Sequence, residues 1–96
     1  MAEVRLSPSA LADLDDIVAY GIERHGKESA AAYFSSFDSV FALLDDHPLS
    51  GQIDEDTGFR RRHHRTHRIF YRVEDEVVLI VRIIHQSRDL GRVEFR

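Results

Sequence analysis

Residues 67–85 read HRIFYRVEDEVVLIVRIIH, two apolar segments on either side of the acidic triplet Glu74 to Glu76. Apolar and β-branched residues fill both segments, which is typical of β-strands, and the triplet predicts a turn between them. The second strand, Val77 to His85, is apolar on both faces, which favours a central position in a sheet. These residues therefore predict an antiparallel strand pair at the heart of the fold.

A third strand is predicted immediately upstream, from Phe59 to His63, with a turn at residues 64–66. The segment before it, Leu49 to Gly58, is polar and acidic and contains two glycines. Such a composition predicts a surface loop. Three consecutive antiparallel strands at the C-terminal end are the natural interpretation.

The N-terminal half carries a different period. Ser7 and Pro8 form a capping signal for a first helix, and Gly26 is placed to end it. Its apolar residues recur at helical spacing, whereas acidic residues, Asp13 and Asp16 among them, are predicted on the other side. A second helix follows through the apolar positions Ala30, Phe34, Phe37, Phe41 and Leu44, before Pro48. Two helices with so short a connection predict an antiparallel hairpin.

With a short strand from Glu3 to Leu6, the order becomes β-α-α-β-β-β. This predicts an α+β fold in which an antiparallel sheet packs on the α-helical hairpin. The 96 residues have the size of one domain, and residues 91–96 are expected to form a flexible tail. The chain has no cysteine, no signal-peptide pattern and no apolar run of membrane-spanning length, so a cytoplasmic protein without membrane partners is expected.

The net charge of −4 conceals an uneven distribution. Residues 1–58 carry three basic and twelve acidic side chains, whereas residues 59–96 carry ten arginines and five acidic side chains. Guanidinium groups make forked hydrogen bonds to carboxylates and phosphates. The C-terminal part is therefore predicted to contact an acidic or phosphate-bearing partner, with an ordinary solvated sheet face as the alternative.

The densest feature is a basic ridge, defined here as residues 59–68, which holds five arginines and three histidines. Strand alternation predicts Arg60 and Arg62 on one face, and Arg61 and His63 on the other. The predicted contacts to a macromolecular partner are Arg60, Arg61, Arg62, Arg65, Arg68 and Arg88. A charged strand that prevents edge-to-edge aggregation is the alternative interpretation.

No familiar cofactor or metal motif is recognisable. His63 and His67 have a spacing that unites two imidazoles on a helix, but here a turn separates them, without a thiolate or carboxylate nearby. Glycine-rich phosphate loops and nucleophile elbows are missing from the sequence. We therefore expect neither a metal site nor a cofactor.

One enzymatic hypothesis survives. Cleavage of RNA by its own 2′-hydroxyl needs a proton acceptor, a proton donor and cations, and no metal. Arg68, Arg82 and His85, with Arg88, are the candidates for these roles. Against it, Arg82 and His85 are three positions apart on one strand, so they should face opposite sides unless a bulge intervenes.

Several motifs together resemble the ParE branch of the RelE/ParE toxin superfamily. They lie in order along the chain as Leu6-Ser7-Pro8, Ala12-Asp13-Leu14 with Ile17, His47-Pro48, residues 68–73 (RIFYRV) and residues 80–89 (IVRIIHQSRD). The resemblance runs from residue 4 to about residue 90. The residues after His85, including Arg88 and Asp89, are similar to a ParE ending.

The resemblance implies the toxin of a type II toxin-antitoxin pair, neutralised by a cognate ParD-like antitoxin whose other part binds operator DNA. ParE-type toxins are associated with inhibition of DNA gyrase, without enzymatic turnover of their own. The alternative is a ribosome-dependent mRNA endoribonuclease of the RelE type. For that alternative, Arg68 falls where cleaving relatives keep an arginine and His85 where some keep a histidine, but their lysines are missing here. A toxin that binds its antitoxin but inhibits nothing is the third hypothesis.

Overall fold

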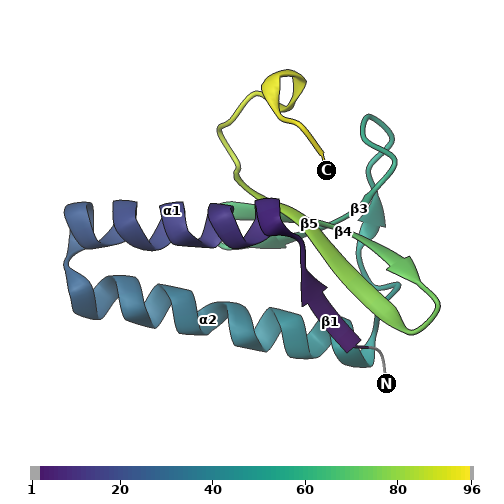
Figure 1. The fold of residues 1–96 in the computed structure, drawn as a ribbon, viewed down its shortest axis with the longest axis horizontal. Coiled ribbons are helices and arrows are strands. Elements are labelled where there is room, and N and C mark those ends of the chain that lie inside the picture. The colour runs from purple at the N-terminus through teal and green to yellow at the C-terminus, as the bar shows by residue number, and fades with distance from the viewer. Residues whose placement is uncertain (1–2, 96) are drawn as a thin grey trace.

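The computed structural model describes residues 3–95. Its order of elements confirms the predicted α+β class, with a helical hairpin followed by most of the sheet (Figure 1). The elements are β1 (Glu3–Leu6), α1 (Pro8–His25), α2 (Lys27–Asp46), β2 (Gln52–Ile53), β3 (Arg60–His64), β4 (His67–Glu74), β5 (Val77–His85) and the short 3-10 helix η1 (Leu90–Arg92). Among the described residues, no helix combines the length and apolar character of a membrane span.

The strands form one sheet in the order β1-β5-β4-β3-β2. β5 lies between β1 and β4, which confirms the internal position that its apolar composition predicted. β2 to β5 are antiparallel, but β1 pairs with β5 in parallel, so the sheet is mixed where the sequence predicted an antiparallel one. The physical reason is that β1 and β5 are joined only through the two helices and β2 to β4, so no tight turn between them forces an antiparallel pairing.

The two helices lie side by side and antiparallel, joined at Gly26 (Figure 1). Gly26 has a φ of 87°, a conformation that a residue with a Cβ rarely adopts. Its N–H donates to the carbonyl of Ile22, the last turn of α1. A glycine at this position therefore lets one helix end and the next begin without a longer loop.

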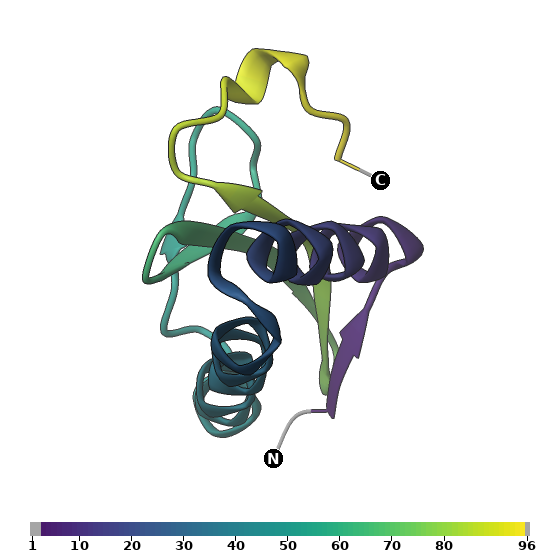
Figure 2. The same ribbon diagram turned by 90° about the vertical axis from the view of Figure 1, so that its left-hand side faces the viewer.

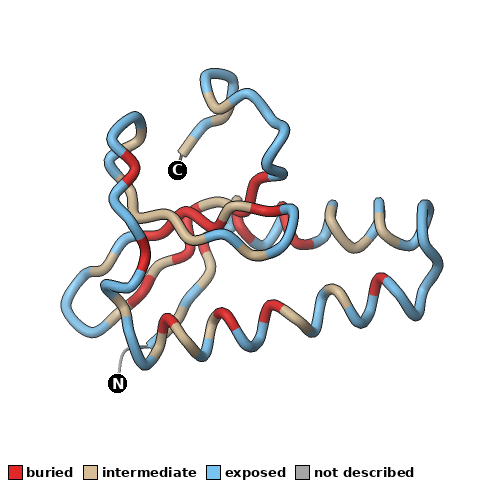
Figure 3. Tube along the Cα trace, turned by 180° about the vertical axis from the view of Figure 1, so that it is seen from behind, coloured by how far each residue is buried: buried red, intermediate tan, exposed pale blue. Residues whose placement is uncertain are grey.

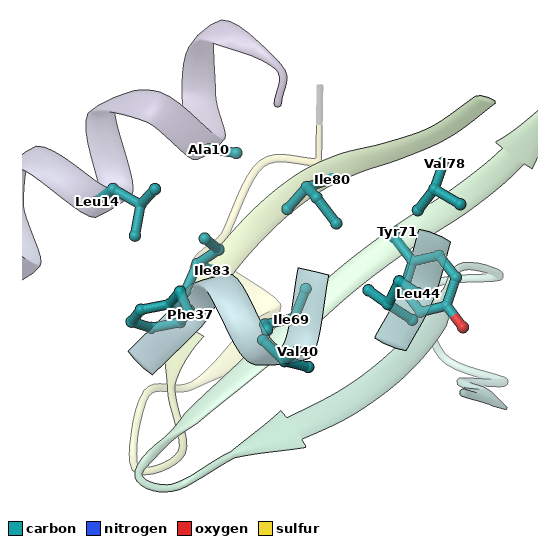
Figure 4. Close-up of a cluster of buried hydrophobic side chains, with 10 residues drawn as sticks. All are labelled: Ala10, Leu14, Phe37, Val40, Leu44, Ile69, Tyr71, Val78, Ile80 and Ile83. Carbon is teal, nitrogen blue, oxygen red and sulfur yellow. The ribbon is translucent and has the colours of Figure 1, made fainter. Parts of the chain in front are cut away.

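The core lies between α2, the base of α1 and one face of the sheet. Phe37, Val40 and Leu44 of α2 point towards Ile69 and Tyr71 of β4 (Figure 4). Leu14, Val78, Ile80 and Ile83 complete the cluster, and the far end of the helical hairpin stays mostly exposed (Figure 3). We call the sheet face towards α2 the inner face and the opposite one the outer face.

Ser7 joins β1, α1 and β5. Its hydroxyl accepts from the N–H of Ala10 at 3.0 Å, as the predicted N-cap should, and donates to the carbonyl of Val81 at 2.9 Å. The pairing of β4 with β5 shifts register opposite this point, where Phe70 pairs with Arg82 and Tyr71 with Ile80. Val81 is the extra residue of this bulge, so the N-cap of α1 is fixed to the irregular point of the central strand.

The segment Leu49–Gly58 departs from the predicted surface loop, because it contributes β2 and two buried residues. Gly51 donates its N–H to the Tyr71 hydroxyl at 2.8 Å. Asp54 accepts from the backbone and the hydroxyl of Thr57. Its short polar side chains thus close the segment on itself and anchor it to β3 and β4.

The C-terminal segment Asp89–Phe95 lies over the outer face, on the side of the strands away from α2 (Figure 2). Phe95 contacts the rings of Phe59 and Phe70. The predicted flexible tail thus overlaps a segment that packs on the sheet, while Arg96 lies outside the described residues.

Candidate functional site

The basic ridge divides between the two faces of the sheet, as strand alternation predicted. Arg60 is paired with Tyr71 across the ladder, and Arg62 with Ile69, both residues of the inner face. Arg61 is paired with Phe70 and His63 with Arg68, which belong to the outer face. Side chains paired directly across two strands share a face, so no single ligand meets the whole ridge.

Three of the predicted contact arginines hold the segment around β2. Arg60 donates to the carbonyl of Gly51 at 2.9 Å. Arg61 forms an ion pair with the buried Asp54 at 3.2 Å. Arg62 donates to the hydroxyl of Ser50 at 3.4 Å. These contacts give the three arginines a local structural role beside the predicted one, which remains a prediction.

The other three predicted contacts lie elsewhere. Arg65 occupies the β3–β4 turn with a φ of 52°, and its guanidinium lies 5.7 Å from the ring centre of Tyr33. Arg88 lies in the exposed turn after β5, and its carbonyl accepts a hydrogen bond from the guanidinium of Arg68 at 3.1 Å. Arg88 lines a pocket on the inner side and Arg65 lies over the ring of Tyr33, another residue of that lining, whereas Arg68 belongs to the outer face.

The pocket, of about 810 Å³, opens between the helical hairpin and the ends of β4 and β5. Ile17, Ala30 and Ile83 give it an apolar part. Its polar lining includes the side chains Asp13, Asp16, Tyr20, Tyr33, Thr66, His67, His85, Ser87 and Arg88. A mixed lining of this kind suits a partner segment that carries both apolar and polar side chains.

Hydroxyl–imidazole pairs line this side of the sheet. The Tyr33 hydroxyl lies 2.6 Å from Nδ1 of His67, and the Ser87 hydroxyl 2.7 Å from Nδ1 of His85. The rings of His67 and His85 meet edge to face, 5.3 Å between centres. His67 is buried, which together with the nearby His85 and His64 lowers its pKa to about 4. It is therefore neutral at physiological pH.

The position of Asp13 differs from the sequence prediction, which placed this residue on the polar side of the first helix. Its side chain is buried and accepts from Nε and Nη2 of Arg82, both at 2.8 Å, and from the N–H of Ile83. The hydrogen bonds that Arg82 donates to Asp13 raise the pKa of Arg82 above its usual value. Asp13 is three positions after Ala10 and four before Ile17, so its spacing within the apolar stripe was the available signal.

The structure does not bring the three ribonuclease candidates together. Arg82 is paired with Phe70 on the outer face, whereas His85 is paired with His67 and lies on the inner side. The bulge at Val81 precedes Arg82, so it does not turn His85 towards it. Arg68 lies on the outer face, two positions from Phe70, while the charge of Arg82 is already matched by Asp13.

Residues 4–90 match the family model of the ParE toxin of the type II toxin-antitoxin system parDE. The chain belongs to the ParE toxin family. It is 43% identical over 89 residues to Toxin ParE1 of Caulobacter vibrioides, covering 91% of this chain and 92% of that protein. Toxin ParE1 of Mycobacterium tuberculosis is 30% identical over 90 residues, with 91% and 92% covered. The resemblance to the ParE branch is thereby confirmed.

Solved structures support the same ParE architecture. A chain of the chromosomal ParDE system from P. aeruginosa superposes with a TM-score of 0.78 at 22% identity, covering 88% of this chain and 96% of that one. A chain of the toxin-antitoxin complex RelBE2 from Mycobacterium tuberculosis gives a TM-score of 0.60 at 25% identity, with 88% and 96% covered. Both branches of the superfamily therefore share this fold.

Proposed function

We propose that this ParE-family toxin acts in the cytoplasm by binding DNA gyrase and blocking replication, without catalytic turnover of its own. The observation that carries the proposal is the separation of the side chains that RNA cleavage would need. Arg82 shares the outer face with Phe70 and its charge is already neutralised by Asp13, while His85 is paired across the strands with His67 on the inner face. A general base and a phosphorane-stabilising cation must act on the same phosphate, which this arrangement does not favour.

We further propose that a ParD-like antitoxin neutralises the toxin by laying a segment in the pocket between the hairpin and the sheet. Arg88 in the lining and Arg65 over the ring of Tyr33 supply positive charge, and Ile17 and Ile83 supply an apolar surface. An acidic, amphipathic segment meets both requirements. Operator DNA is then contacted by the antitoxin and not by the toxin itself.

The deciding experiment places two assays side by side with one preparation of the protein. Purified gyrase is assayed for supercoiling and for trapped cleavage complex, and ribosomes programmed with a transcript are assayed for cleavage. Gyrase inhibition with intact transcript is the expected result. Transcript cleavage that a His85→Ala variant abolishes, with gyrase unaffected at large molar excess, would instead establish the ribonuclease alternative.

A further inference from the structure

The outer face carries two aromatic rings and two arginines that the proposed antitoxin pocket does not include. Phe70 projects from the middle of β4 and is fully buried although it points away from the core. Phe59, just before β3, lies beside it under the same cover. Arg68 and Arg82 flank them, with the Arg68 guanidinium 5.9 Å from the ring centre of Phe70. We call these four residues the aromatic–arginine surface.

The chain's own C-terminal segment, Asp89–Phe95, covers this surface and is called the strap (Figure 2). Phe95 stacks on Phe59 with 5.6 Å between ring centres and meets Phe70 edge to face at 5.0 Å. The carbonyl of Glu94 accepts from Nη1 of Arg82 at 2.6 Å. The ring of Phe95, the carbonyl of Glu94 and the charge of Glu94 near Arg82 therefore connect the end of the strap to the sheet.

The strap leaves one hydrogen-bond donor of the aromatic–arginine surface without an acceptor in the described part of the chain. Nε of Arg68 is buried, yet within residues 3–95 it has no hydrogen-bond partner. A buried cationic donor is stabilised when an acceptor reaches it, above all a carboxylate. The strap itself carries a carboxylate next to an aromatic ring, in Glu94 and Phe95, and the charge of Glu94 acts on Arg82, but Nε of Arg68 is left without an acceptor among the described residues. A ligand whose carboxylate also reaches Nε of Arg68, beside an aromatic ring, would therefore match this surface better than the strap does.

The strap is also weakly embedded. None of its residues is buried, and Asp89, Gly91, Arg92 and Glu94 are exposed. The connecting residues Gln86 to Arg88 are exposed as well. A segment with so little buried surface opens at low free-energy cost, so a partner with more contacts can displace it.

We infer that the aromatic–arginine surface binds an extended segment of the toxin's protein target, one carrying an aromatic side chain next to a carboxylate, and that the strap occupies this surface until the target displaces it. The inference rests on the proposed function, since gyrase is the target considered. It adds a second interaction surface, on the face opposite the antitoxin pocket. The strap then acts as an internal competitor that lowers the apparent affinity of the toxin for its target.

The test compares gyrase inhibition by the full chain and by Phe95→Ala and Phe95→Leu variants. Removing the ring frees the surface, so Phe95→Ala should reach half-inhibition at a roughly tenfold lower protein concentration, and Phe95→Leu at an intermediate one. Adding Phe59→Ala to Phe95→Ala should abolish the gain, because the target then loses its stacking partner. Trypsin cleavage after Arg92 should accelerate in Phe95→Ala, which reports strap opening independently of gyrase.

Each outcome separates the two proposals. Inhibition by the wild type with equal or weaker inhibition by an opened, folded Phe95→Ala variant would overturn the displaceable strap and leave the proposed function standing. Inactivity of both proteins would contradict the proposed function and, with it, this inference. Tighter binding of Phe95→Ala to a duplex oligonucleotide, without tighter binding to gyrase subunits, would overturn the assignment to a protein segment. Circular dichroism and the melting temperature establish that each variant is folded.

Discussion

Asp13 and Arg82 form a two-pronged ion pair that ties the first helix to the central strand across 69 positions of sequence. Both side chains are nearly buried, with 10% and 13% of their surfaces exposed, respectively. Arg82 also donates to the carbonyl of Glu94, so one guanidinium connects α1, β5 and the C-terminal segment. The pair therefore acts as a structural joint between α1, β5 and the C-terminal segment.

Replacing Asp13 by Asn should destabilise the protein by about 3 kcal/mol, because it leaves the buried charge of Arg82 without its counter-ion. The neutral amide also offers one oxygen where three donors converge. The measurement is the free energy of unfolding in urea. Asp16→Asn on the same helix, at an exposed position, is the matched control and should change it by less than about 0.5 kcal/mol. Equal effects of Asp13→Asn and Asp16→Asn on the free energy of unfolding would contradict the role of the Asp13–Arg82 pair as a structural joint.

A glycine is required at position 51 because the surrounding atoms leave no space for a Cβ. A Cβ there would lie 2.6 Å from the Tyr71 hydroxyl and 2.9 Å from the carbonyl of Arg61. Gly51→Ala should therefore cost about 2 kcal/mol and lower the melting temperature, since the fully buried Tyr71 cannot move aside without disturbing the core. Ser50→Ala, at the exposed neighbouring position, should have little effect. An unchanged melting temperature for Gly51→Ala would show that the segment around β2 is loosely held.

The arginines predicted to contact a partner, Arg88 and those of the ridge, should separate into two classes when they are replaced. Arg65→Gln and Arg88→Gln should each weaken the antitoxin complex about threefold at low salt, a difference that 0.5 M salt largely removes by screening. Arg61→Gln should instead lower stability by about 1 kcal/mol, because Asp54 is buried. Arg5→Gln, on the far edge strand, controls for the change in net charge. Salt-insensitive affinity would refute the role of the ridge.

Most of the fold was readable from the sequence because periodicity and capping agree along the chain. Ser7, Pro8 and Gly26 mark the bounds of α1, and the apolar run from Val77 marks the internal strand. The parallel pairing of β1 was not readable, because a strand of four residues carries no information about its direction. β2 was missed because its residues lie in a segment that local composition assigns to a loop, and tertiary contacts, including those with Arg60 and Arg61 of β3, hold that segment against the sheet.

The candidate site was harder to predict from the sequence, because its charged side chains pair with residues that are far away in sequence. Ten arginines in one region indicate a binding surface, yet Arg61 and Arg82 are held by the carboxylates Asp54 and Asp13 of the acidic half. The pocket needs Tyr33 of α2 against His67 of β4, a contact that only the docked hairpin creates. Composition predicts such a surface in general terms, whereas the tertiary contacts decide which cations remain available to a ligand.

Stability should fall on mild acidification because of His67. Its pKa is lowered to about 4 in the folded protein, first by burial and then by the nearby imidazoles of His85 and His64, while Asp13 acts in the opposite direction. In the unfolded chain the ring titrates near 6.5, so between that pH and about 4 the unfolded state binds a proton that the folded state does not. The contribution of neutral His67 to the free energy of unfolding is fully present above pH 6.5 and is lost as the pH falls to about 4, a change of up to about 3 kcal/mol.

Urea titrations at successive pH values measure this dependence of the free energy of unfolding on pH. A His67→Gln variant should lose the dependence, whereas His47→Gln, at an exposed position, should keep it. Parallel pH profiles for wild type and His67→Gln would show that His67 is protonated in the fold at no extra cost.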